Sequence, residues 1–136
     1  MRRTTIVAAL AAAIIALAGC SASADEKAQD CAAALSERTG GDSKDTPTVG
    51  EAKERVDAFD KTLAGMVRSG YQSQADRAFN TLGTKAKEGG EERPEACGPL
   101  SDDDYTALQM ATAINSLGWT KDGEFDKLQM VEHLDG

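Results

Sequence analysis

The sequence predicts an all-α fold, a small helical bundle of about four to five helices. Alanine, the strongest helix former, recurs throughout the chain, whereas β-branched residues are sparse. Apolar residues recur three and four positions apart, as on one face of a helix, and no alternation typical of a strand persists. Stretches rich in glycine, proline and small polar residues separate these periodic segments and predict the loops.

The first helix is predicted over residues 25–38. Ser23 and Glu26 have the spacing of a capping box, and Thr-Gly-Gly at 39–41 ends the segment. Its apolar stripe consists of Ala28, Cys31, Ala32 and Leu35. We therefore expect Cys31 on the buried side of this helix.

A polar loop at residues 39–48 leads to the clearest helix of the chain. Thr48 and Glu51 form its capping signal, and Ser-Gly at 69–70 ends or bends it. Its apolar residues alternate at spacings of four and three: Ala52, Val56, Phe59, Leu63 and Met66. Because this seam lasts only about two heptads, it favours a bundle core over an oligomeric coiled coil.

A third helix is predicted over residues 71–87, forming a hairpin with the second. Its periodic apolar positions are Tyr71, Ala75, Ala78 with Phe79, Leu82 and Ala86. Gly83 costs about 1 kcal/mol relative to alanine and indicates close helix packing or an early end. Residues 88–100 contain two prolines, three glycines and Cys97, and predict a loop.

Ser101 is the predicted N-cap of a fourth helix. The run Asp-Asp-Asp at 102–104 falls in its first turn, where carboxylates oppose the positive end of the helix dipole. This explanation requires no metal ion. The expected buried stripe is Ala107, Leu108, Met110, Ala111, Ile114 and Leu117, followed by a stop at Gly118.

A short last helix is predicted over residues 123–134, and we expect it to fold back over Trp119. One face carries Phe125, Leu128, Val131 and Leu134. His133, the single histidine, is expected to be a solvated residue near the C-terminus.

Residues 1–19 have the three parts of a secretory signal peptide. Arg2 and Arg3 are the charged start, an apolar centre of 13 residues runs from Ile6 to Ala18, and small residues follow. As a helix that centre would span roughly 20 Å, less than the ~30 Å hydrocarbon core of a bilayer. We therefore expect a cleaved signal, with an uncleaved anchor helix as the alternative.

The stretch Leu17-Ala18-Gly19-Cys20 closes the apolar run and resembles the lipobox of bacterial lipoproteins. The resemblance covers residues 1–20, and the composition beyond it resembles exported actinobacterial proteins. It implies diacylglyceryl transfer to the Cys20 sulfur and cleavage after Gly19, which places the chain at the extracytoplasmic face of the cell membrane. Residues 20–24 would be a lipidated cysteine with a short tether, and residues 25–136 the helical domain.

Charge and cysteine content refine this expectation. Removing Arg2 and Arg3 with the signal leaves 13 basic and 23 acidic residues, a formal charge of −10. Such a surface repels nucleic acid and anionic lipid, so only the lipid on Cys20 is expected to hold the membrane, and nucleic-acid binding is excluded.

With Cys20 assigned to lipid, Cys31 and Cys97 remain in a chain expected to reach an oxidising compartment. A disulfide closing a loop of about 67 residues would stabilise the fold by roughly 4 kcal/mol in the chain-entropy model. Two buried free thiols are the alternative. A redox-active centre is disfavoured because the CxxC spacing is missing.

No catalytic, cofactor or metal site is predicted. Asp122, Glu124 and Asp126 alternate as at the start of a calcium loop. Lys127 and His133, however, stand where an EF-type loop requires Gly and Glu. A lone histidine also leaves Ser-His-Asp and multi-histidine zinc arrangements unsupported.

Three function classes follow. The first is a membrane-anchored lipoprotein with a non-enzymatic interaction domain and an unidentified protein partner. The second is a lipoprotein that binds a small apolar ligand in a cavity lined by Phe59, Phe79, Leu108 and Trp119. The third is a hydrolase using two converging carboxylates, but 23 acidic residues make chance proximity expected.

Overall fold

The computed structural model describes residues 24–41, 44–90 and 92–135. The predicted signal peptide and the lipobox with Cys20 lie outside the described residues. The elements are α2 (Ala24–Thr39), α3 (Val49–Arg68), α4 (Gln72–Gly90), the 3-10 turn η1 (Glu95–Cys97), α5 (Asp102–Ser116), β1 (Thr120–Lys121), β2 (Glu124–Phe125) and α6 (Lys127–Asp135). The predicted all-α bundle is confirmed.

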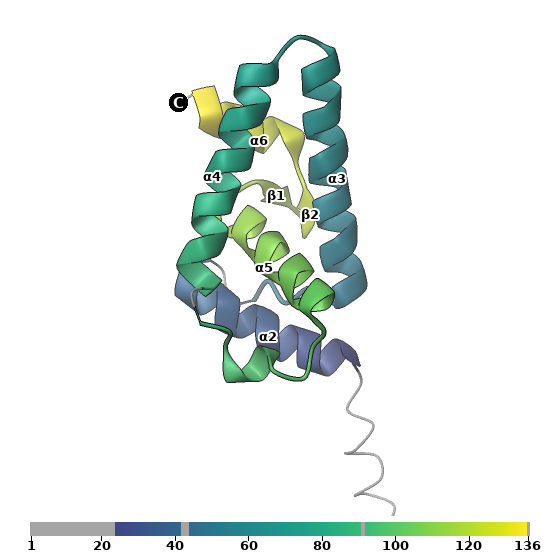
Figure 1. Ribbon diagram of the computed structural model, residues 1–136, viewed down its shortest axis with the longest axis vertical. Helices are drawn as coiled ribbons and strands as arrows, with labels where there is room; N and C mark the ends of the chain where they lie inside the picture. The colour runs from purple at the N-terminus through teal and green to yellow at the C-terminus, as the bar shows by residue number, and fades with distance from the viewer. Residues whose placement is uncertain (1–23, 42–43, 91, 136) are drawn as a thin grey trace, which may run out of the picture.

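The helices give the domain two distinct ends (Figure 1). The antiparallel helices α3 and α4 stand side by side, and α5 lies between them. Helix α2 crosses the lower end, where the described chain begins. The α3–α4 turn forms the opposite end together with α6. Among the described residues, no helix is long and apolar enough to cross a membrane.

Side chains cap the helices largely where the sequence predicts them to. The Thr48 hydroxyl accepts a 3.2 Å hydrogen bond from the Glu51 backbone N–H at the start of α3. Ser101 accepts an equivalent bond of 3.2 Å from Asp104 at the start of α5. Each bond satisfies a backbone donor that lacks a partner within the helix.

The core consists of two clusters that meet along α5. The lower cluster contains Ala28, Cys31, Ala32, Leu35, Ala52, Cys97, Ala107, Leu108 and Ala111. The upper cluster contains Phe59, Met66, Ala75, Ala78, Leu82, Ala113, Ile114, Trp119 and Met130. Both α3 and α5 contribute to the two clusters. Helix α5 also packs against α2, α3 and α4, and it is the central helix of the domain.

A disulfide joins Cys31 on α2 to Cys97 in η1, as predicted. The two cysteines are 66 positions apart in sequence, and their Cα atoms are 4.6 Å apart. Both cysteines are fully buried. The crosslink therefore holds the segment between α4 and α5, which is short of apolar side chains, against the lower cluster.

The predicted apolar faces of two helices are partly wrong. Phe79 on α4 is 57% exposed and Leu128 on α6 is 72% exposed. Successive helical residues are rotated by about 100°, so the buried Ala78 turns Phe79 away from the core. On α6 the buried residue is Met130, two positions and about 200° from Leu128.

A β-hairpin replaces the predicted start of the last helix. Thr120 pairs with Phe125 and Lys121 with Glu124. The turn residues Asp122 and Gly123 have φ values of 53° and 83°, the left-handed conformation of a two-residue hairpin turn. Helix α6 consequently begins at Lys127.

Trp119 lies beneath the last helix, as expected. Its ring is fully buried and stacks on Phe59, with centroids 6.1 Å apart. His133 of α6 is exposed to solvent but also contacts the Trp119 ring edge-on, with centroids 6.1 Å apart. His133 thus covers one edge of the buried Trp119 ring.

Two glycines of α4 have different surroundings. Gly83 has no heavy atom within 4 Å of a built Cβ, and α4 continues beyond it to Gly90. Neither predicted role of Gly83 is realised. The close approach occurs instead at Gly89, where a Cβ would lie 2.8 Å from Thr39 Cγ2 on α2.

Candidate functional site

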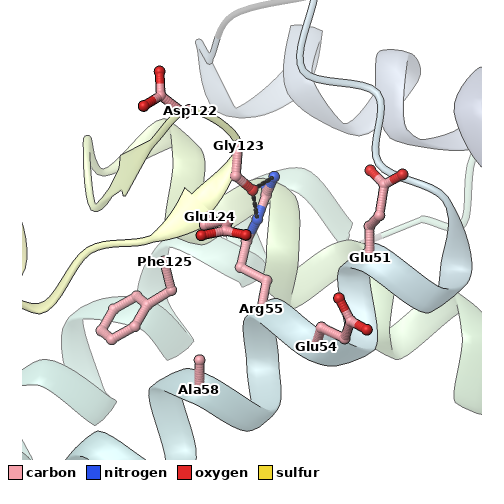
Figure 2. A pocket seen from close by; sticks show the side chains of 8 residues that line it. All are labelled: Glu51, Glu54, Arg55, Ala58, Asp122, Gly123, Glu124 and Phe125. Carbon is pink, nitrogen blue, oxygen red and sulfur yellow. Dashed lines mark hydrogen bonds between the residues drawn. The ribbon is translucent and has the colours of Figure 1, made fainter.

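One pocket lies between α3 and the β-hairpin (Figure 2). Its volume is about 430 Å³. The lining residues are Glu51, Glu54, Arg55 and Ala58 from α3, and Asp122, Gly123, Glu124 and Phe125 from the hairpin. We call this the acidic pocket because four carboxylates surround it.

Arg55 is the residue that holds this pocket together. It is 4% exposed, and its Nε and Nη2 donate hydrogen bonds of 3.2 and 2.7 Å to the Gly123 carbonyl (Figure 2). Nη1 donates to the Ala111 carbonyl of α5 at 2.9 Å. Nη1 and Nη2 also bind the two oxygens of Asp45, at 2.8 and 2.9 Å. All five N–H donors of the guanidinium are therefore engaged.

Asp45 thus neutralises the positive charge of Arg55. Arg55 forms no ion pair with the four carboxylates that line the pocket. They do not converge: Figure 2 shows Asp122 pointing away from the pocket and Glu51 and Glu54 on the opposite side. No group of three His, Cys, Asp or Glu side chains in the described residues could hold a metal ion. The pocket has the charge to attract an organic cation, but it lacks converging carboxylates for hydrolysis.

A second pocket, which we call the tip groove, lies at the opposite end from α2. Its volume is about 320 Å³, and its lining residues are Gly65, Met66, Ser69, Tyr71, Gln74, Lys127 and Val131. Tyr71 is 56% exposed, and the neighbouring Val67 is 48% exposed. Lys127 is the only charged residue of the lining. The groove is therefore mainly apolar, with a cationic edge.

The predicted apolar cavity is not present as the sequence suggested. Phe59, Leu108 and Trp119 are fully buried in the core, and Phe79 is largely exposed. Leu108 also belongs to the lower cluster, whereas Phe59 and Trp119 belong to the upper one. These four side chains therefore do not surround a common cavity.

The acidic runs have local structural roles in this fold. Asp122 lies in the hairpin turn, Glu124 lies in β2, and Asp126 caps α6. In the second run, Asp102 pairs with Arg93 at 2.9 Å, and Asp104 with Lys53 at 2.8 Å. Asp102, Asp104 and Asp126 thus have ion-pair or capping roles, whereas Asp122 and Glu124 are residues of the hairpin.

Sequence reasoning missed Arg55, although a signal was available. Arg55 lies three residues after Ala52 and four before Phe59, so it shares their buried face. A charged residue on such a face requires a buried partner. Asp45 could not be identified as that partner because it lies in a loop whose path the pattern does not specify.

The structure places the predicted disulfide but does not include the predicted lipid site among its described residues. Cys31 and Cys97 are brought together, whereas Leu17, Ala18, Gly19 and Cys20 lie outside the described residues. Comparisons of the chain with protein-family models, with curated proteins and with solved structures found no match in any of the three.

Proposed function

We propose that this chain is an exported lipoprotein, held at the extracytoplasmic face of the cell membrane by lipid on Cys20. Its helical domain binds another protein and performs no catalysis. The observation that carries this proposal is the separation between α2, where the described chain begins, and the α3–α4 turn at the opposite end (Figure 1). The residues that line the partly apolar tip groove lie at and near that turn and in α6.

This separation suits a tethered binding domain. Helix α3 has 20 residues and a length of about 30 Å, and it leads from the α2 end to the tip. A short tether at residues 20–24 would keep the α2 end near the bilayer. The charge of −10 over residues 20–136 repels anionic lipid. The surfaces of the domain that the tether does not hold would therefore lie away from the bilayer. The tip would then face partners away from the membrane.

Exposed apolar side chains near the tip groove support a binding function for the domain. Val67 and Tyr71 remain exposed, although burying such side chains would stabilise the domain. Exposed apolar residues beside a groove are typical of interaction surfaces. The carboxylates of the acidic pocket, in contrast, diverge from one another.

The test of membrane attachment is fractionation of cells that produce the Cys20→Ser variant. We expect the variant to leave the membrane fraction or to retain residues 1–19, with the fold of the domain unchanged. A Cys31→Ser/Cys97→Ser variant is the control, because it lacks two cysteines but keeps the lipid site. Native processing and membrane attachment of Cys20→Ser would refute the lipoprotein assignment.

A further inference from the structure

We propose that the tip groove binds a protein segment that presents an apolar side chain next to a carboxylate. This inference deepens the proposed function, because it rests on the domain being a protein-binding module.

The floor of the groove is open to an incoming apolar side chain. Gly65 has no heavy atom within 4 Å of a built Cβ, so the surface of α3 is accessible there. Met66, which is buried, and the half-buried Val131 supply apolar walls, and Tyr71 supplies an exposed ring. A volume of about 320 Å³ is at the lower end of the range for ligand pockets, which suits one or two side chains.

The charge at the groove favours an acidic partner. Lys127 lines it, and Arg68 follows the exposed Val67 at the end of α3. Neither side chain makes a hydrogen bond or ion pair with any other described residue. No carboxylate belongs to the lining. A partner carboxylate could therefore pair with a cation that the domain leaves uncompensated.

A protein segment fits these observations better than a lipid surface does. The tip lies at the opposite end from α2, so a tether at α2 would hold it away from the domain's own membrane. The acidic pocket would attract positively charged ligands, and the tip groove would attract negatively charged ones. The ligands of the two pockets can therefore be distinguished by their charge. Peptides selected for the tip should be acidic and apolar, and peptides selected for the acidic pocket should be basic.

The experiment selects binders from a display library of random dodecapeptides on the full mature protein held in nanodiscs. The blocking variant is Gly65→Leu, which places a side chain on the open floor without removing any contact. Its matched control is Gly83→Leu, a helical glycine with equally open surroundings outside the groove. Thermal unfolding of both variants verifies that the fold is retained.

We expect the selected peptides to combine Asp or Glu with Leu, Ile or Phe. The best of them, resynthesised, should bind Gly65→Leu at least tenfold more weakly than the parent, with no change for Gly83→Leu. Lys127→Glu should weaken binding, and Lys121→Glu on the hairpin should not. If Gly65→Leu does not fold, Tyr71→Ser replaces it as the groove variant.

Other outcomes would overturn the proposal. They are an absence of enriched peptides, a basic consensus that points to the acidic pocket, or acidic peptides whose binding is insensitive to Gly65→Leu. Groove-dependent sedimentation of the unlipidated protein with phosphatidylglycerol vesicles would assign the groove to lipid instead. Peptide binding is therefore measured again on the Cys20→Ser protein in solution, so that failure of the groove proposal is distinguishable from failure of the membrane assignment.

Discussion

The buried guanidinium of Arg55 should make a larger contribution to stability than any exposed ion pair of the domain. Arg55→Met keeps most of the side-chain volume but removes the donors to Gly123, Ala111 and Asp45. The Asp45 side chain is only 14% exposed, so its carboxylate would be left without its partner and largely shielded from water. Breaking a buried pair in this way costs about 3–5 kcal/mol.

Such a loss is a large part of the roughly 5–15 kcal/mol that stabilises a domain. Urea unfolding followed by Trp119 fluorescence measures it, because the single tryptophan is fully buried in the native state. We expect a lower midpoint with an unchanged slope. The melting temperature should fall by on the order of 15 °C.

Two further variants isolate the cause. Lys61→Met removes an exposed ion pair with Asp57 on the surface of α3 and should cost less than about 1 kcal/mol. Adding Asp45→Leu to Arg55→Met removes the stranded carboxylate and should recover part of the lost stability. The reasoning would be refuted if Arg55→Met were no more destabilising than Lys61→Met.

Three other predictions concern stability. Replacing both disulfide cysteines by alanine should cost roughly 4 kcal/mol in chemical unfolding, and a loss below 1 kcal/mol would contradict the loop-entropy argument. Gly83→Ala should stabilise α4 by up to about 1 kcal/mol, whereas Gly89→Ala should destabilise the domain because its Cβ would lie 2.8 Å from a side chain of α2. The hydrogen bond from Lys53 lowers the pKa of Asp104, so this group stabilises the fold above the usual aspartate pKa of about 3.9 and ceases to do so as the pH falls through the lowered value. The stability difference between wild type and Asp104→Asn should therefore shrink below pH ~4, and a difference that grew with acid would contradict it.

Local signals in the sequence predicted much of this fold. The Thr48 and Ser101 caps and the seam of α3 depend on interactions within a few residues, which a pattern can reveal. The disulfide followed from counting cysteines after one was assigned to lipid. These features needed no knowledge of how the helices are placed relative to one another.

The errors arose where a local pattern was ambiguous or tertiary contacts decided the outcome. Asp122-Gly123 is a strong hairpin signal, but the spacing of Phe125 and Leu128 also fits a helix that begins at residue 123. Phe79 continues an apolar stripe that is wider than the surface α4 can bury. The tip groove was beyond prediction because it joins the end of α3 to α6, which are separated by about 60 residues in sequence.

Lipid attachment at Cys20, in a mature chain that begins there and carries a disulfide-linked domain, is the proposal on which the binding function depends. Its most direct test is the intact mass of the protein purified from membranes, measured after alkylation without reduction. We predict a chain that starts at Cys20, carries acyl groups there, and shows no alkylation at Cys31 or Cys97. A mass that includes residues 1–19, or one that lacks acyl groups, would contradict the account.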